Sequence, residues 1–397
     1  MIALAPQQRP RTSPDLRAVA MHIRRFTTLD ELAPFADDWE RLAAGVPFRG
    51  WTWLSHWWRH YGPQTAADAR RSELAVLGVF DDAGALRGIA PWHLEISAMR
   101  GRVLRPLGCG EVCSEYVSVL CDPPVEKEVV KALAGYLLDN ARHRHPDALR
   151  WDLLDLDTVE AADAAVTALV GDLSASGCTV HRRPGMTCWR IELPGDWEQY
   201  VASLGRNLRR GLRRLERNVF DAGRAVLRSP TGLDELAQAM DVLVELHQQR
   251  WTTLGEPGCF ASPRFLAFYH DVVPAMQRLG QLQFHWLELD GKAVAAKYGL
   301  IGDGVMYAYQ GGVDPAAIEF EPGKLILSAV LQEAIGLGYR AFDLLRGDEP
   351  YKAAFGAQPR PTIDFRVVPR RAGAQCRHQL WSARYRAKQW LKRKLRK

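Results

Sequence analysis

The order of predicted helices and strands repeats once along this 397-residue chain, and that repetition limits the folds it can adopt. From residue 22 to 193, the apolar spacing predicts helices, then an antiparallel meander, then helix, strand, helix and strand. The same order returns after residue 195, without a residue-level repeat. We therefore expect two tandem α+β domains, each a mixed, mainly antiparallel sheet flanked by helices.

The predicted elements follow hydrophobic periodicity and turn signals. In the first half, helices are predicted at 28–44, 51–61, 123–144 and 159–174, and strands at 74–80, 85–96, 103–107, 116–120, 150–156 and 178–193. In the second half, helices are predicted at 197–220, 233–254, 263–279, 325–337 and after residue 350, and strands at 281–289, 293–301, 305–311, 341–345 and 362–368. The corresponding boundaries are a disordered arm at 1–20, domains at 21–194 and 195–369, and a basic tail at 370–397.

Composition excludes several classes of protein. The chain is 47% hydrophobic and 25% charged, as in soluble globular proteins. It lacks an uninterrupted apolar run of about 20 residues and a basic-then-apolar leader, so we expect a cytoplasmic protein. Its seven cysteines are scattered and odd in number, which favours reduced thiols. No four-ligand zinc pattern accompanies them, and we expect no metal site.

The charge of the chain is divided between an acidic body and a basic tail. Residues 365–397 contain twelve Lys and Arg and no Asp or Glu, so the net charge of +6 leaves −6 on the rest. From residue 375 onward, leucine, tryptophan and tyrosine are interleaved with the basic residues. This pattern predicts an amphipathic helix lying peripherally on an anionic membrane surface at residues 375–397. A solvated or disordered basic end is the alternative.

A strand, a glycine-containing loop and a helix follow one another between residues 305 and 337. Free backbone N–H groups and the positive end of a helix dipole bind phosphate at such a junction. The candidate cofactor-binding residues are Gln310, Gly311, Gly312, Gly323 and Lys324. The alternative is that these glycines only form a bend and a helix entry.

Two further polar clusters are candidate sites. One follows the apolar strand at 341–345, and loops at strand ends commonly carry functional residues. Its members are Asp343, Arg346, Asp348, Glu349, Tyr351 and Lys352. The other consists of His247, Arg250 and Trp251, which share one face of a helix. Structural ion pairs, a capped core and a buried histidine are the alternatives.

The order of these motifs resembles a known family. It comprises the aromatic helix at 51–61, the arginine-rich helix at 204–219, His247 to Trp251, the Asp290-Gly291 hairpin, Tyr307 to Gly312, and Asp343 to Lys352. Together they resemble the CelD/BioF2-like acetyltransferases of the GNAT (Gcn5-related N-acetyltransferase) superfamily, which are relatives of the FemABX peptidoglycan transferases. The resemblance implies a tandem acetyltransferase fold, acetyl-CoA or another acyl-CoA as donor, and a link to polysaccharide or cell-envelope metabolism.

Acyl transfer from a thioester to an amine requires positioning and two proton transfers. In this interpretation Asp348 or Glu349 accepts the proton of the amine, Tyr351 protonates the departing thiolate, and Lys352 holds a phosphate or carboxylate. The substrate-binding candidates are His247, Arg250, Trp251, Asp343 and Arg346. Residues 121–127, the counterpart of the glycine loop in the first half, contain no glycine. We therefore expect the donor in the second half only, with the first half shaping the acceptor channel.

Two other functions compete with acyl-CoA-dependent transfer to a small amine, an amino sugar or an envelope precursor. The first is a FemABX-like transfer of an amino acid from aminoacyl-tRNA, for which the basic tail and the arginine-rich helix would hold RNA phosphates. The second is a non-catalytic accessory protein of envelope polysaccharide synthesis, which would bind no thioester.

Overall fold

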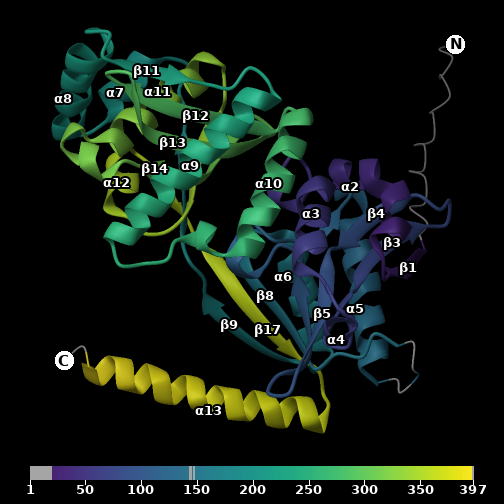
Figure 1. The fold of residues 1–397 in the computed structure, drawn as a ribbon. Coiled ribbons are helices and arrows are strands. Elements are labelled where there is room, and N and C mark those ends of the chain that lie inside the picture. The colour runs from purple at the N-terminus through teal and green to yellow at the C-terminus, as the bar shows by residue number, and fades with distance from the viewer. Residues whose placement is uncertain (1–19, 143–144, 146–147, 396–397) are drawn as a thin grey trace, which may run out of the picture.

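The computed structural model describes residues 20–142, 145 and 148–395, and these residues form two lobes with a long C-terminal helix (Figure 1). Both lobes combine mixed sheets with covering helices, which confirms the expected α+β class and the two-domain arrangement. The expected N-terminal arm, residues 1–20, lies outside the described residues except for residue 20. The final two residues of the expected tail lie outside them as well.

The first lobe contains two sheets. The four-stranded sheet has the order β1 (Met21–Phe26), β3 (Val76–Asp81), β4 (Leu86–Ala90) and β7 (Leu120–Cys121). The six-stranded sheet has the order β2 (Ser72–Leu74), β5 (Trp92–Ser97), β6 (Gly101–Pro106), β8 (Leu153–Glu160), β17 (Thr362–Val368) and β9 (Thr179–Pro184). Its helices are α1 (Leu29–Leu32), α2 (Ala36–Leu42), α3 (Trp51–Tyr61), α4 (Ala66–Ala69), α5 (Glu126–Arg142) and α6 (Ala164–Ala175).

The second lobe is built on one seven-stranded sheet. Its strand order is β11 (Ala225–Arg228), β12 (Leu282–Leu289), β13 (Lys292–Gly302), β14 (Val305–Val313), β15 (Ala341–Arg346), β10 (Cys188–Glu192) and β16 (Gln358–Arg360). Its helices are α7 (Trp197–Ser203), α8 (Arg206–Leu215), α9 (Leu233–Thr253), α10 (Pro263–Arg278), α11 (Pro322–Gly336) and α12 (Pro350–Ala354). Helices α9 and α10 cover one face of the sheet and α11 covers the other.

Two strands are exchanged between the lobes, which corrects the sequence-based placement of both. The predicted strand at 178–193 is two strands, of which β9 belongs to the first lobe and β10 pairs with β15 and β16 of the second. The last predicted strand, 362–368, was expected in the second domain. As β17 it lies instead between β8 and β9 of the first lobe. Both β10, which precedes the predicted domain boundary between residues 194 and 195, and β17, which follows it, therefore pair with strands of the other predicted domain.

Prolines account for two other differences from the predicted elements. The helix expected at 28–44 is interrupted by a 3₁₀ turn at Ala33–Phe35, since Pro34 cannot donate a backbone hydrogen bond inside a helix. The strand expected at 85–96 divides at Pro91 into β4 and β5, which belong to different sheets. Of the strand expected at 116–120, only residue 120 belongs to a strand, at the start of β7.

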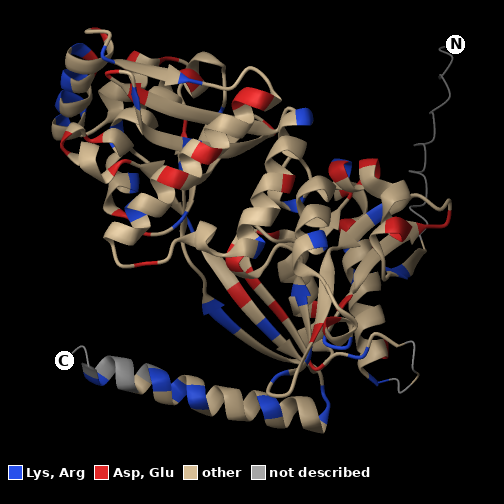
Figure 2. Cartoon of the chain, in the orientation of Figure 1, with Lys and Arg blue, Asp and Glu red and all other residues tan. Residues whose placement is uncertain are grey.

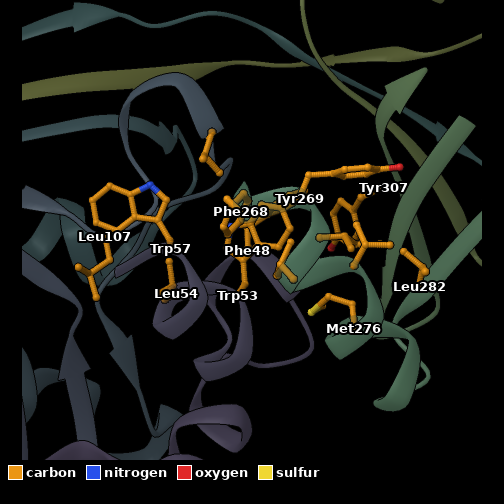
Figure 3. Packing of buried hydrophobic residues seen from close by; sticks show 14 of the residues in the cluster. Phe48, Trp53, Leu54, Trp57, Leu107, Phe268, Tyr269, Met276, Leu282 and Tyr307 are labelled. Atoms are coloured by element: carbon orange, nitrogen blue, oxygen red, sulfur yellow. The ribbon is translucent and has the colours of Figure 1, made fainter. Parts of the chain in front are cut away.

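One hydrophobic core joins the two lobes. Trp53 of α3 is buried and lies edge-on to Phe268 of α10, with ring centroids 5.1 Å apart. Phe48 contacts both Trp53 at 5.4 Å and Tyr307 of β14 at 5.7 Å (Figure 3). Aromatic pairs of this geometry add to the free energy of burial. The aromatic helix predicted at 51–61 therefore anchors the first lobe to the sheet of the second.

The chain ends in helix α13 (Ala372–Leu395), which runs along the β9 side of the first lobe (Figure 1). Trp381 and Tyr385 of this helix stack against each other and contact His181 of β9. Within the part of the chain that the structure describes, no helix has the length and apolar composition needed to cross a bilayer.

Candidate functional site

Strands β14 and β15 separate from each other in the middle of the second lobe. They pair in parallel only over Val305–Tyr307 and Ala341–Asp343, although β14 continues to Val313. From residue 308 onward, no described strand pairs with the edge of β14 that faces β15. A β-bulge at Tyr309 accompanies this divergence, since Tyr298 faces Gln310 whereas Gly299 faces Ala308. The sheet therefore opens a notch lined by backbone groups able to bind a ligand.

A cavity of about 370 Å³ occupies this notch. Its walls come from β13, the end of β14, the first turn of α11, helix α12 and the C-terminal end of α9. The lining residues are Arg250, Ala296, Lys297, Gly311, Gly312, Val313, Gly323, Lys324, Ile326, Leu327, Tyr351 and Phe355. Four predicted cofactor-binding residues, one predicted substrate-binding residue and one predicted catalytic residue are thus brought together at one site.

Positive charge dominates this cavity. Its lining contains Arg250, Lys297 and Lys324, and no acidic residue among the described ones. The Lys324 ammonium donates to Glu321, which caps α11. No described residue forms a hydrogen bond or ion pair with the side chain of Arg250 or Lys297. Because α11 also directs its positive dipole end here, the cavity is suited to an anionic group.

Lys297 is the member of this set that the sequence analysis missed. It lies inside β13, directly across from Gly311 of β14 and His285 of β12, on the face covered by α11. Burial, assisted by the nearby Lys352 ammonium, lowers the pKa of Lys297 to about 8. A single lysine within the alternating strand pattern carries no distinctive motif. Its lack of an acidic partner becomes visible only when the strands are paired.

Replacing Lys297 with methionine is expected to stabilise the protein near neutral pH. This added stability, relative to the wild type, should decrease as the pH rises. The pKa of Lys297 is about 8 in the folded protein and 10.5 ordinarily. Between these values the unfolded chain binds more protons, so the stability of the wild type increases with pH across this window. One pKa unit corresponds to about 1.4 kcal/mol, so the difference in the free energy of unfolding between the variant and the wild type should decrease by about 1–3 kcal/mol. Urea unfolding of both proteins between about pH 7 and 10 measures this difference.

Lys131→Met, at an exposed position of α5, is the matched control for the loss of a lysine. A difference between Lys297→Met and the wild type that stays constant over this pH range would contradict the desolvation of Lys297.

The glycines of the predicted phosphate loop have different roles. A methyl group at Gly311 would meet only the Ala296 carbonyl at 3.4 Å, and one at Gly323 only Val313 at 3.8 Å, so both keep the cavity open. A methyl group at Gly312 would lie 2.4 Å from the backbone nitrogen of His247. Gly312 is therefore required for the packing of β14 against α9, in addition to lining the cavity.

Gly312→Ala is accordingly expected to destabilise the protein by about 1–3 kcal/mol, as overpacked cores generally do. Gly336→Ala provides the matched control, because an added methyl group there would meet nothing within 4 Å. At the end of α11 this second substitution should be neutral or stabilising by up to about 1 kcal/mol. Thermal and urea unfolding of both variants measure the difference. Equal stability of the two variants would show that α9 moves aside without cost.

Three residues of the predicted cofactor-binding and substrate-binding sets, Gln310, His247 and Trp251, do not line the cavity. Gln310 faces Tyr298 in the β13–β14 pair and does not line the cavity. His247 is buried, and its ring contacts the Cys259 thiol at 3.5 Å and the Phe260 ring at 4.9 Å. Trp251 packs beside His247 and is partly exposed. Roles of these three residues in binding remain predictions.

Asp343 and Arg346 connect the two lobes. Asp343 is fully buried, and its Oδ2 accepts from the Tyr116 hydroxyl at 2.6 Å and from Arg190 Nε at 3.0 Å. Arg346 donates to the buried Glu115 of the first lobe. Burial raises the pKa of both Asp343 and Glu115. These contacts give Asp343 and Arg346 a structural function at the lobe interface, whereas their predicted substrate contacts are untested.

The predicted catalytic residues occupy three different environments. Tyr351 lines the cavity and is 44% exposed, and partial burial raises the pKa of its phenol to about 12. The Lys352 ammonium is buried and donates to the carbonyls of residues 345, 346 and 347 at 2.6–3.1 Å, which holds the loop after β15. Asp348 is exposed and accepts from the Trp189 indole at 3.1 Å. Of the three, only Tyr351 lines the cavity.

Among the described residues, no group of three or more His, Cys, Asp or Glu side chains is placed to hold a metal ion.

The region that builds this cavity matches a known family model. Residues 206–353 match the model described as an acetyltransferase (GNAT) domain. This interval includes eleven of the twelve lining residues, all except Phe355. The chain therefore contains a GNAT-type acetyltransferase domain. The cavity at the separation of β14 and β15 lies within this domain and is accordingly the candidate active site.

Solved structures show the same overall fold. The crystal structure of FemX aligns with a TM-score of 0.59 at 10% identity, covering 87% of this chain and 96% of FemX. A conserved protein of unknown function from Bacteroides thetaiotaomicron aligns with a TM-score of 0.51 at 12% identity, covering 87% of this chain and all of that one. A comparison with curated proteins found no match. The GNAT domain is thus part of a FemX-like two-lobed fold.

Proposed function

We propose that this protein is an acyltransferase that moves an acyl group from acyl-CoA, such as acetyl-CoA, to an amine. The observation that carries the proposal is the cationic cavity where β14 leaves β15 at the start of α11. It supports an anionic, extended donor, because backbone groups, a helix N-terminus and two unpaired cations meet in one notch.

The phosphates and the pantetheine chain of coenzyme A both have complementary surfaces in this cavity. Its phosphates fit the first turn of α11 around Gly323, with Arg250 available as a counter-charge. The amides of its pantetheine chain fit the unpaired edge of β14, in the manner of an added strand. This arrangement would direct the thioester toward Tyr351 on α12.

Proton transfer in this proposal rests on the titratable groups that line the cavity. Tyr351 is protonated at neutral pH, because its pKa is about 12, and it can donate a proton to the departing thiolate. Lys297, with a pKa of about 8, is neutral in part of the population and can accept the proton of the attacking amine. Asp348, the base predicted from the sequence, would reach the amine only if the acceptor extends toward Trp189.

The proposed acceptor is a small amine, an amino sugar or an envelope precursor. Its binding surface would include the first lobe, since Tyr116 and Glu115 approach β15 beside the notch. This acceptor class rests on the sequence resemblance.

One observation favours the aminoacyl-tRNA alternative. Arg206, Arg210, Arg214 and Arg217 are exposed on and just after α8, which is conspicuously basic in Figure 2. Arg214 lies 3.7 Å from Glu321, the residue that caps α11 at the mouth of the cavity. A basic surface next to the donor site could hold the phosphates of a nucleic acid.

The melting temperature with acetyl-CoA, free CoA or aminoacyl-tRNA distinguishes these functions. A ligand at 100 times its dissociation constant adds about 2.7 kcal/mol to the free energy of unfolding. We expect stabilisation by both acetyl-CoA and CoA. Stabilisation by charged tRNA alone would replace the proposal with the aminoacyl alternative. No stabilisation by any donor would support the non-catalytic alternative.

A further inference from the structure

Helix α13 carries a concentrated positive charge next to the first lobe. Its 24 residues include seven Lys and Arg and no Asp or Glu, and Figure 2 shows it as blue without red. Among the described residues, the protein holds this helix through Trp381 and Tyr385 against His181, through Arg377 against Asp152, and through Gln375 against Thr179. Leu380 and Trp390 are 65% and 56% exposed. A helix of this composition has basic and apolar groups available for another surface.

A second cavity, of about 380 Å³, lies between α13 and the six-stranded sheet. Its apolar lining residues include Met99, Leu153, Val368, Leu380 and Trp381. Its charged lining residues are Arg100, Arg366, Arg377 and Arg384 and a single acid, Asp152. Met99, on the turn between β5 and β6, is 68% exposed at its rim. The cavity is therefore amphiphilic, open, and separate from the GNAT donor site.

Buried hydrogen-bond donors in this cavity lack partners. Arg366 is only 7% exposed, and its guanidinium lies 4.1 Å over the Trp381 ring and 3.3 Å from Asp155. No described residue hydrogen-bonds to the buried Nε atoms of Arg366 and Arg377 or to Nδ1 of His378. Leaving such groups unsatisfied is unfavourable for the folded protein. These nitrogens are closed to water, so acceptor oxygens of a ligand would reach them once the surrounding side chains of α13 move to admit it.

The Arg384 side chain strengthens the same conclusion. It lines the cavity, is exposed, and has no ion-pair or hydrogen-bond partner among the described residues. By contrast, Arg377 is already bound to Asp152 at 2.8 Å. Arg384 is thus a free cation beside exposed apolar side chains, which is the combination that a phosphate-headed amphiphile requires.

We propose that α13 and this cavity form a docking surface for an anionic membrane, with the cavity receiving the phosphate headgroup of one lipid. Met99 and Leu380 enter the boundary between headgroups and acyl chains, while the arginines bind phosphate oxygens. Basic residues near an anionic bilayer favour binding electrostatically, and buried apolar area adds to this. The proposal is independent of the donor site and would place the GNAT domain beside lipid-linked acceptors.

Vesicle sedimentation of the full chain tests this surface. The probes are phosphatidylglycerol–phosphatidylcholine vesicles and phosphatidylcholine vesicles, at low and high salt. We expect binding to the anionic vesicles only, weakened by salt. The double variant Leu380→Glu/Arg384→Glu changes two exposed positions and should weaken binding by at least about tenfold, because it removes an apolar contact and reverses a charge.

Arg210→Glu/Leu337→Glu is the matched control, since it makes the same chemical changes at exposed positions of the second lobe. It should bind like the wild type. Equal weakening by both double variants would overturn the proposal in favour of a general charge effect. Absence of binding, equal binding to phosphatidylcholine, or full release by inorganic phosphate at constant ionic strength would also overturn it, the last in favour of a free-anion site.

Discussion

Asp343→Ala is expected to lower the free energy of unfolding by about 3–5 kcal/mol, which is the usual cost of removing one partner of a buried ion pair. Asp343 is fully buried and accepts from Tyr116 of the first lobe and Arg190 of β10. Its Oδ1 also accepts from the Leu345 backbone at 2.9 Å, and Leu345 has a positive φ of 54°. Alanine would leave the Arg190 cation unpaired and remove the bond that holds Leu345 in its strained conformation.

Glu198→Ala is the control for loss of a carboxylate, since Glu198 pairs with Arg213 at an exposed site where about 0–1 kcal/mol is expected. Asp343→Asn should fall between the two, because it retains hydrogen-bond acceptance without the charge. Urea unfolding measures all three. A loss below about 1 kcal/mol for Asp343→Ala would mean that water replaces the carboxylate at the lobe interface. A stable variant that no longer binds an acceptor would instead support the substrate contact predicted from the sequence.

Local patterns predicted most of the elements but not the strand exchange. The aromatic helix at 51–61 and the Asp290-Gly291 hairpin are where the periodicity and turn chemistry placed them. Membership of a sheet is a tertiary property, however, and β17 has the same apolar pattern whichever lobe receives it. The strand predicted at 178–193 is two strands of different sheets, and the chain passes from one sheet to the other near Gly185. An added methyl group at Gly185 would lie 2.3 Å from the Thr362 hydroxyl.

The sequence grouped only some of the residues that line the candidate site, because the others meet only through tertiary structure. The strand–loop–helix motif grouped Gly311, Gly323 and Lys324, and these three residues line one cavity because all are close in sequence to the start of α11. Lys297 comes from a neighbouring strand and Arg250 from the end of α9, so their meeting depends on strand pairing. The polar residues after β15 looked equivalent in the sequence. Their burial separates Asp343, which holds the lobes together, from Tyr351, which faces the cavity.

Gly323→Leu is expected to abolish the rise in melting temperature produced by acetyl-CoA. Gly323 occupies the first turn of α11, lines the donor cavity, and has open space where a side chain would project. Leucine would fill the position proposed for the phosphates without requiring backbone strain, so the fold should persist. If the affinity falls at least about 100-fold, the roughly 2.7 kcal/mol of stabilisation at 100 times the wild-type dissociation constant falls to about 0.4 kcal/mol or less.

Gly336→Leu separates this loss from a general effect of leucine on α11. It lies at the opposite end of the same helix, is exposed, and has no atom within 4 Å of an added methyl group. This variant should retain the full response to acetyl-CoA, as measured by differential scanning fluorimetry and calorimetric titration. An unchanged response in Gly323→Leu would place the donor elsewhere, whereas loss in both variants would indicate that α11 itself had been disturbed. Loss in Gly323→Leu alone would locate the donor phosphates at the N-terminus of α11, because that is the one feature of the helix that the two positions do not share.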